Sequence, residues 1–216
     1  MDKIFAEHKG FWTKENKKSL YQSFLLIVLA FIIQISAGHY SSRVATSSNF
    51  VGDVFLDNLP VINLDFVVVF GALLFWMFAF TFMAFRPKYL LFGLKAVALF
   101  IVFRAFFISL THIGIYPHQI FIGPDDAGFR LYKLFTFQGN FFFSGHAGFP
   151  FLMALIFWRE KKWRWFFLSV TFIFAASVLL AHVHYSIDVF AAPFITYGIF
   201  KAAEKLFQRD YSISQT

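Results

Sequence analysis

Long uncharged apolar runs constrain the fold of this chain more than any other feature. Six of them follow one another after residue 19, at 20–38, 61–85, 89–114, 141–158, 165–181 and 186–200. Most are close to the roughly 20 residues that a helix needs to cross the hydrocarbon core of a bilayer. A backbone in lipid must satisfy its own hydrogen bonds, which favours helices. The sequence therefore predicts an all-α, polytopic membrane protein with six transmembrane helices in one bundle.

Composition agrees with a membrane domain and narrows the chemistry. Charged residues make up 14% of the chain, against about a quarter in soluble domains. The chain has no cysteine, which excludes disulfides, thiolate nucleophiles and cysteine-ligated metal sites. We expect a cytoplasmic or interfacial segment at 1–19, a catalytic membrane domain at 20–200 and a cytoplasmic tail at 201–216.

The basic residues predict the orientation of the bundle. Fourteen of them lie at one set of ends of the apolar runs and three lie at the other set. The larger set comprises Lys3, Lys9, Lys14, Lys17, Lys18, Arg86, Lys88, Arg159, Lys161, Lys162, Arg164, Lys201, Lys205 and Arg209, and the smaller set comprises Arg43, Arg130 and Lys133. Because cytoplasmic ends carry the excess of basic residues, we expect both termini in the cytoplasm. The net charge of +7 then reflects membrane boundaries, and no nucleic-acid partner is expected.

Two histidine-containing stretches fall at the predicted non-cytoplasmic surface. FSGH at 143–146 lies at the outer end of the fourth run, and AHVHYSIDVFAA at 181–192 leads into the sixth. His184 and Asp188 are four residues apart, which places them on one face of a helix. A carboxylate there can accept a hydrogen bond from one imidazole nitrogen and leave the other as a nucleophile or base. We expect His146, His184 and Asp188 to meet at this surface and to cleave a phosphoester.

Three further charges lie within or beside the predicted spans. Arg104 is about 22 Å from the inner end of the third run at 1.5 Å per residue, and its planar fork of donors suits a phosphate. Lys95 is only about 9 Å from that end, so we expect its side chain to extend out to the headgroups. Asp65 is a possible partner for Arg104 or for a histidine, and a residue at the interface is an equal alternative.

Two other chemistries use the same residues. A zinc site could include His182, His184 and Asp188, but two histidines that are two residues apart diverge on a helix, and no wider ligand set is present. A serine hydrolase could use Ser144, but the G-x-S-x-G turn of such enzymes is missing. We expect no metal and no cofactor.

FSGH at 143–146 and AHVHYSIDV at 181–189 resemble the two catalytic motifs of the sphingomyelin synthases, a branch of the type 2 phosphatidic acid phosphatase superfamily. The resemblance implies that His184 attacks phosphorus, forms a phosphohistidine and is oriented by Asp188. It implies that His146 protonates the leaving oxygen and then deprotonates the acceptor. It also implies that Arg104, Ser144 and Gly145 bind the substrate phosphate. Ser177 is followed by valine where the phosphatase branch has arginine, which favours the synthase-like branch.

The sequence therefore predicts a lipid phosphotransferase that moves a phospho-headgroup from a phospholipid to a lipid alcohol. A lipid phosphate phosphatase or phospholipase C-like hydrolase with the same histidines is the alternative, because the sequence does not say whether water or a lipid alcohol is the acceptor. A non-catalytic lipid-binding or transport protein is the alternative from another class. We expect a bacterial inner membrane, with the site facing the periplasm.

Overall fold

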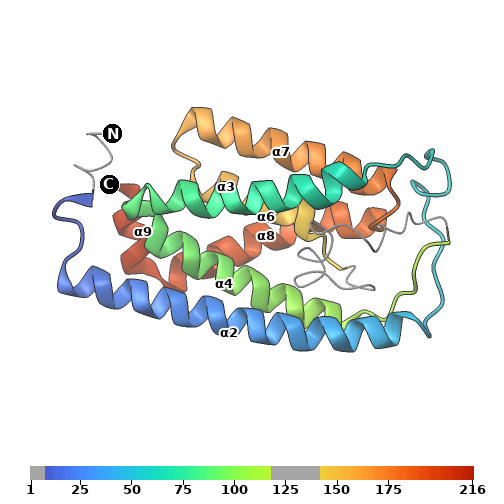
Figure 1. Cartoon of the computed structure of the whole chain (residues 1–216), viewed down its shortest axis with the longest axis horizontal. Coiled ribbons are helices and arrows are strands. Elements are labelled where there is room, and N and C mark those ends of the chain that lie inside the picture. The colour runs from blue at the N-terminus through green and yellow to red at the C-terminus, as the bar shows by residue number, and fades with distance from the viewer. Residues whose placement is uncertain (1–7, 118–141) are drawn as a thin grey trace.

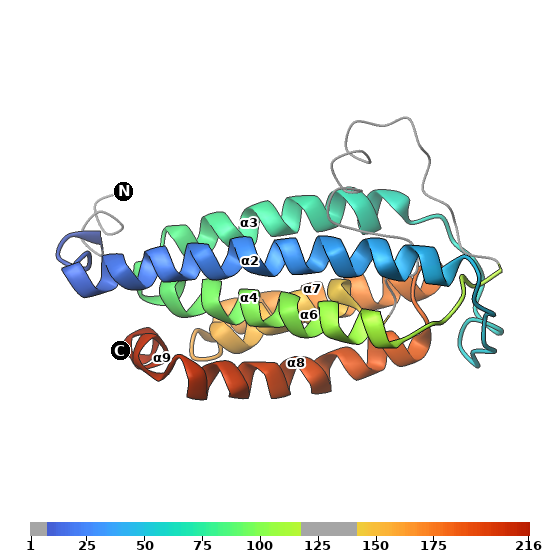
Figure 2. The same cartoon turned by 90° about the horizontal axis from the view of Figure 1, so that it is seen from below.

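The computed structural model describes residues 8–117 and 142–216, and this part of the chain is helical and contains no strand. The helices are α2 (Lys14–Ala45), η1 (Phe66–Gly71), α3 (Ala72–Ala84), α4 (Pro87–Leu110), α6 (Gly145–Ile156), α7 (Lys161–Leu180), α8 (Ser186–Leu206) and α9 (Gln208–Gln215). They run side by side along one axis, with the start of α2 and the whole of α9 at the same end of the bundle (Figure 1). The view from below shows the same arrangement (Figure 2). The all-α prediction is confirmed.

Within residues 8–117 and 142–216, four helical segments are long and apolar enough to cross a membrane. They are α2, the continuous segment Phe66–Ala84 formed by η1 and α3, α4, and α7. The other two predicted spans correspond to α6, an apolar helix of 12 residues, and to α8, which has 21 residues. Their lengths differ from the predicted runs because Ser144 caps α6 late and because α8 continues beyond residue 200.

The two ends of the chain are more helical than the sequence suggested. Helix α2 begins at Lys14, where the side chain of Thr13 accepts the N–H of Asn16 at 3.2 Å. The segment after residue 200, expected as a tail, completes α8 and then forms α9.

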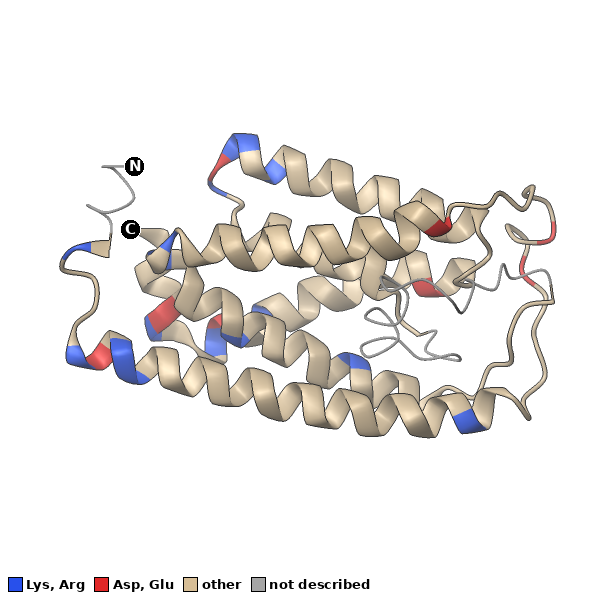
Figure 3. Ribbon diagram, in the orientation of Figure 1, with Lys and Arg blue, Asp and Glu red and all other residues tan. Residues whose placement is uncertain are grey.

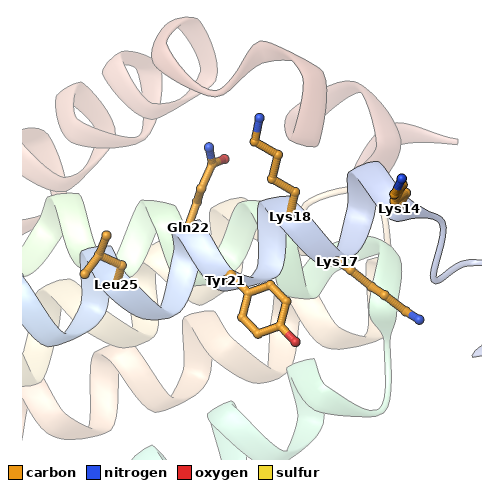
Figure 4. Close-up of a pocket in the computed structure, with 6 residues that line it drawn as sticks. All are labelled: Lys14, Lys17, Lys18, Tyr21, Gln22 and Leu25. Carbon is orange, nitrogen blue, oxygen red and sulfur yellow. The ribbon is translucent and has the colours of Figure 1, made fainter.

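A shallow groove of about 480 Å³ lies on the first turns of α2, between Lys14, Lys17, Lys18, Tyr21, Gln22 and Leu25 (Figure 4).

Helix α4 is the centre of the bundle. Its buried residues run from Pro87 to Ile108, and it packs against α2, α3, α6, α8 and α9. Phenylalanine rings fill the space between α3, α6 and α7, where Phe75 meets Phe149, Phe167 and Phe174 edge to face at 5.7 to 6.0 Å. Helix α2, in contrast, exposes large apolar side chains along most of its length, as a lipid-facing helix does.

The end of the bundle where α2 begins carries a concentration of Lys and Arg (Figure 3). Arg86 donates to both carboxylate oxygens of Glu160 at 2.6 and 2.7 Å, which ties the α3–α4 turn to the start of α7. Deeper in the bundle, Lys95 donates to Asp210 at 2.5 Å and to Ser19 at 2.9 Å. The expectation that Lys95 extends to the headgroups is therefore wrong, because α9 folds back and brings a carboxylate to it.

At the opposite end, irregular segments cover the helix ends. The N–H of Ile62 donates to the carbonyl of Leu180 at 2.8 Å, and the N–H of Gly114 donates to the carbonyl of Asn49 at 3.0 Å. A Cβ atom on Gly114 would lie 2.3 Å from the carbonyl oxygen of Ser48, so only glycine allows these two backbones to approach. The segments 46–65 and 111–117 thus pack on one another above the ends of α7 and α8.

Candidate active site

The FSGH stretch forms the start of α6. Ser144 has an extended backbone and caps the helix, its side chain accepting the N–H of Ala147 at 3.4 Å, which is the usual role of serine at this position. Its own N–H donates to the backbone carbonyl of Asp188 at 3.0 Å. This hydrogen bond joins the two predicted motifs directly. His146 is the second residue of α6, at the end of the bundle opposite to the termini.

The second motif forms a tight turn between α7 and α8. This α7–α8 turn, residues 181–185, starts where the N–H of Val183 bonds to the carbonyl of Val178 at 2.9 Å and His182 takes a positive φ of 54°. A left-handed residue usually follows the end of a helix in this way. His184 lies within the turn and α8 begins only at Ser186. The prediction that His184 and Asp188 share a helix face is therefore wrong.

The contact between His184 and Asp188 nevertheless forms, because the carboxylate reaches back to the turn. Asp188 Oδ2 accepts the backbone N–H of Tyr185 at 3.1 Å and lies 3.4 Å from His184 Nδ1. A carboxylate only accepts hydrogen bonds, so this contact favours a proton on Nδ1 and the lone pair of the neutral ring on Nε2. The fully buried carboxylate is placed to hold the tautomer that the sequence led us to expect.

The two histidine rings lie next to each other. Their centroids are 5.9 Å apart and their planes are inclined by 68°. The rings are therefore close enough for one phosphate group to contact both. His146 Nε2 is 3.1 Å from the carbonyl oxygen of Val68. Since a carbonyl also only accepts, this contact favours a proton on Nε2 of the neutral His146 ring and the lone pair on Nδ1. Val68 belongs to η1, a π-helical segment, and such segments are frequent at functional sites.

Arg104 reaches the same place from α4. Its Nε donates to the carbonyl of Phe143 at 3.0 Å, directly before the capping Ser144. A Cβ atom on Gly145 would lie 3.2 Å from Arg104 Nε. A larger residue at this position would therefore crowd the guanidinium, whereas glycine gives it space. Arg104, Ser144 and Gly145, the residues predicted to bind phosphate, thus meet at the positive end of α6, which favours anions.

The imidazole of His184 and the carboxylate of Asp188 are both buried. Asp188 has no exposed surface and His184 is 5% exposed. Asp188 Oδ1 has no hydrogen-bond partner within residues 8–117 and 142–216. A buried carboxylate is costly unless positive charge or hydrogen bonds surround it. The buried carboxylate is therefore placed to stabilise positive charge that develops on the His184 ring during a reaction.

The other residues considered from the sequence lie around this group. The ring of His182 packs edge to face against Tyr116 at 5.5 Å. Asp65 precedes η1, and its Oδ1 is buried with no hydrogen-bond partner in the described part of the chain. No cluster of three or more potential metal ligands occurs among the described residues. Arg130 and Lys133, used to predict the orientation, lie outside the described residues.

Sequence reasoning missed two contributions to the site. The carbonyl of Val68 becomes available through the π-helical turn of η1, for which an apolar run gives no signal. Asp53 reaches the start of α8 from a loop 133 residues upstream. The sequence VGD at 51–53 is typical of a turn, but it does not indicate that Asp53 contacts Ser186.

A comparison with known protein families gives a match in the C-terminal third of the chain. Residues 139–206 match the family described as PAP2 superfamily C-terminal. This span contains His146, His184 and Asp188. A search of curated proteins finds no match for the chain. The family match supports membership of the PAP2 superfamily, and with it a membrane enzyme of the lipid phosphatase or phosphotransferase type.

Proposed function

We propose that this protein is a lipid phosphotransferase that moves a phospho-headgroup from a phospholipid to a lipid alcohol through a phosphohistidine, as the sphingomyelin synthases do. The observation that carries the proposal is the pair of histidine rings 5.9 Å apart, with Asp188 on Nδ1 of one of them. This arrangement provides a nucleophile, its orienting carboxylate and a second acid–base group around one phosphorus atom.

In the first step, Nε2 of His184 forms a bond to phosphorus as the bond to the leaving oxygen breaks. The negative charge of the bound phosphate favours a second proton on His146, at Nδ1, and His146 gives that proton to the leaving oxygen. Asp188 stabilises the positive charge that develops on the His184 ring. Arg104 and the N–H groups at the start of α6 stabilise the charge on the phosphoryl oxygens, where such transfers need it most.

In the second step, the hydroxyl of the acceptor lipid attacks the phosphohistidine. His146 takes the hydroxyl proton, and the bond between phosphorus and Nε2 breaks. The two half-reactions return both histidines to their starting states. An imidazole nucleophile thus divides one difficult transfer into two easier ones.

The site lies at the non-cytoplasmic surface in this proposal, in the periplasm if the protein resides in a bacterial inner membrane. Its support is the accumulation of Lys and Arg at the opposite end of the bundle (Figure 3), which the positive-inside rule assigns to the cytoplasm. Six helices then cross the bilayer, including the short α6 and the longer α8. Helix α6 has 12 residues, about 18 Å at 1.5 Å per residue, so it covers only part of the bilayer, and its first turn carries His146.

Hydrolysis is the second candidate function, and the PAP2 match favours it, because a phosphatase uses the same covalent intermediate with water as the acceptor. One assay separates the two functions. The purified protein in liposomes receives a phospholipid with a labelled headgroup, together with diacylglycerol or ceramide. We expect His184-dependent recovery of the label on the lipid alcohol, whereas recovery in water-soluble product would establish the hydrolase. Label that stays in the donor would contradict both and favour a non-catalytic lipid-binding protein.

A further inference from the structure

The loop between α2 and η1 carries a buried carboxylate. Asp53 has only 7% of its surface exposed. Its Oδ1 accepts the backbone N–H groups of Phe55 at 2.9 Å and Leu56 at 3.2 Å. Aspartate commonly closes a tight turn in this way. One of its two oxygens is therefore used within the loop.

The other oxygen contacts the beginning of α8. Asp53 Oδ2 accepts the N–H of Ser186 at 2.6 Å. Ser186 is the first residue of α8, and its N–H is one of those that a helix cannot satisfy internally. The preceding N–H, that of Tyr185, goes to Asp188. Two carboxylates thus hold two successive N–H groups at the point where the α7–α8 turn becomes a helix.

Further contacts fix Asp53 in place. Its own N–H donates to Asp57 Oδ2 at 3.2 Å, and the hydroxyl of Tyr116 donates to Asp57 Oδ1. The ring of Tyr116 in turn packs edge to face against His182 at 5.5 Å and Tyr185 at 5.9 Å. The loop and the segment after α4 therefore form a brace around the α7–α8 turn.

We infer that Asp53 is a positioning residue for the reaction. By holding the N–H of Ser186, it fixes the first turn of α8 and so the place from which Asp188 orients His184. The inference rests on the proposed function of this site. Small displacements matter here, because a shift of about 1 Å in a reacting group can cost roughly 100-fold in rate.

The charge state of Asp53 agrees with this role. Burial alone would raise the pKa of Asp53, but hydrogen bonds from the N–H groups of Ser186, Leu56 and Phe55 and from the side chain of Ser186 lower it below its ordinary value. The carboxylate is thus ionised at neutral pH. An anion at the first turn of a helix is also favoured by the helix dipole.

The test removes the hydrogen bond from each side in turn. Asp53→Ala removes the acceptor. Ser186→Pro removes the donor while keeping a helix start, because proline is favoured at the first helical position and the extended Tyr185 before it is compatible with proline. Ser186→Ala keeps the N–H, and Asn58→Ala changes an exposed side chain whose amide donates only within the loop, to the carbonyl of Val54.

We expect kcat to fall about 10- to 100-fold in Asp53→Ala and in Ser186→Pro, with KM within about twofold and a folded protein by thermal unfolding. The double variant should be no slower than either single variant, because both remove the same hydrogen bond. Ser186→Ala should lose much less than Ser186→Pro, and Asn58→Ala should match the wild type. Unchanged kcat, additive losses, or a loss equal to the fraction unfolded would each overturn the inference.

A second measurement separates this inference from the proposed function. Spectra of ¹⁵N-labelled histidine report which ring nitrogen of His184 carries the proton, with no need for turnover. We expect Nδ1–H in the wild type and a mixture of tautomers in Asp53→Ala. If the wild type transfers no headgroup, the proposed function fails, and the spectra still decide the positioning role. Identical His184 spectra in both proteins would refute it.

Discussion

The bundle buries a polar cluster near each end, and the two clusters differ in how their charges are matched. The inner cluster consists of Ser19, Lys95 and Asp210, drawn from α2, α4 and α9. Its lysine and aspartate are in contact at 2.5 Å, and Ser19 bonds to both of them. The outer cluster consists of Arg104, His146, His184 and Asp188. Its arginine and His146 each contact a neutral backbone carbonyl.

This difference separates a structural cluster from a chemical one. Opposite charges in the inner cluster cancel, so it has little capacity for another anion. The outer cluster sets one carboxylate against an arginine and two titratable rings, and Asp188 Oδ1 has no hydrogen-bond partner among the residues described. An incoming phosphate would meet positive charge and hydrogen-bond donors there. We therefore expect variants of the outer cluster to change activity, and variants of the inner cluster to change stability.

The largest effect is expected for His184→Ala. Loss of the nucleophile should lower headgroup turnover by about 10⁵-fold or more, with little change in the thermal unfolding midpoint. His112→Ala is a matched control, because that histidine lies at the same end of the bundle and, among the described residues, its ring nitrogen hydrogen-bonds to the exposed Tyr40. Equal turnover in the two variants would show that His184 is not needed for the reaction and would contradict the assignment of the outer cluster to the chemistry.

Asp188→Asn should be the next most severe change in activity. An amide in place of the carboxylate can present a donor to His184 Nδ1 and favour the wrong tautomer, which costs about 10³- to 10⁴-fold in comparable sites. Steady-state turnover with the folded fraction measured in parallel checks this expectation. A loss below tenfold would show that the carboxylate does not set the tautomer.

Lys95→Met, in contrast, should lower the stability of the protein and leave its activity nearly unchanged. It removes one of the two cations of the buried Asp210, since Arg209 still contacts Oδ1 at 3.0 Å, so the cost should lie below the about 3 to 5 kcal/mol of a buried pair fully broken on one side. The double variant Lys95→Met/Asp210→Leu should recover much of that stability, because both charges are then removed. Thermal unfolding measures both effects. Turnover per folded molecule should stay near that of the wild type, and a large fall would mean that the inner cluster also serves the chemistry.

The smallest effect concerns pH and the loop above the outer cluster. The pKa of Asp53 is lowered in the folded protein because the effect of burial, which raises it, is outweighed by the N–H donors of Ser186, Leu56 and Phe55 and by the side chain of Ser186. Its contribution to stability is thus present above the ordinary carboxyl pKa near 4 and is lost as pH falls through the lower folded value. The gap in unfolding midpoint between wild type and Asp53→Asn should be constant from pH 7 to 5 and should shrink below pH 4. A gap that widens below pH 4 would contradict the assigned direction.

The helical architecture and the meeting of His146, His184 and Arg104 were predictable, since apolar runs, charge bias and two short motifs carry that information locally. The inner ion pair was not, because it requires α9 to fold back on α4, and nothing local links Lys95 to Asp210. The position of His184 in a turn also escaped prediction, since it depends on the left-handed backbone of His182. The same applies to Asp53 and to the carbonyl of Val68, which act through backbone contacts between distant segments.

The account depends most on a covalent bond between phosphorus and His184. The direct measurement is mass spectrometry of the wild type after brief exposure to labelled phospholipid without a lipid-alcohol acceptor, under conditions that preserve acid-labile phosphate. Without the acceptor, the second step is slow and the intermediate should accumulate. We predict labelled phosphate on His184 and none in the His184→Ala variant. Headgroup turnover by the wild type without any phosphate on His184, or with phosphate on another residue, would contradict the account.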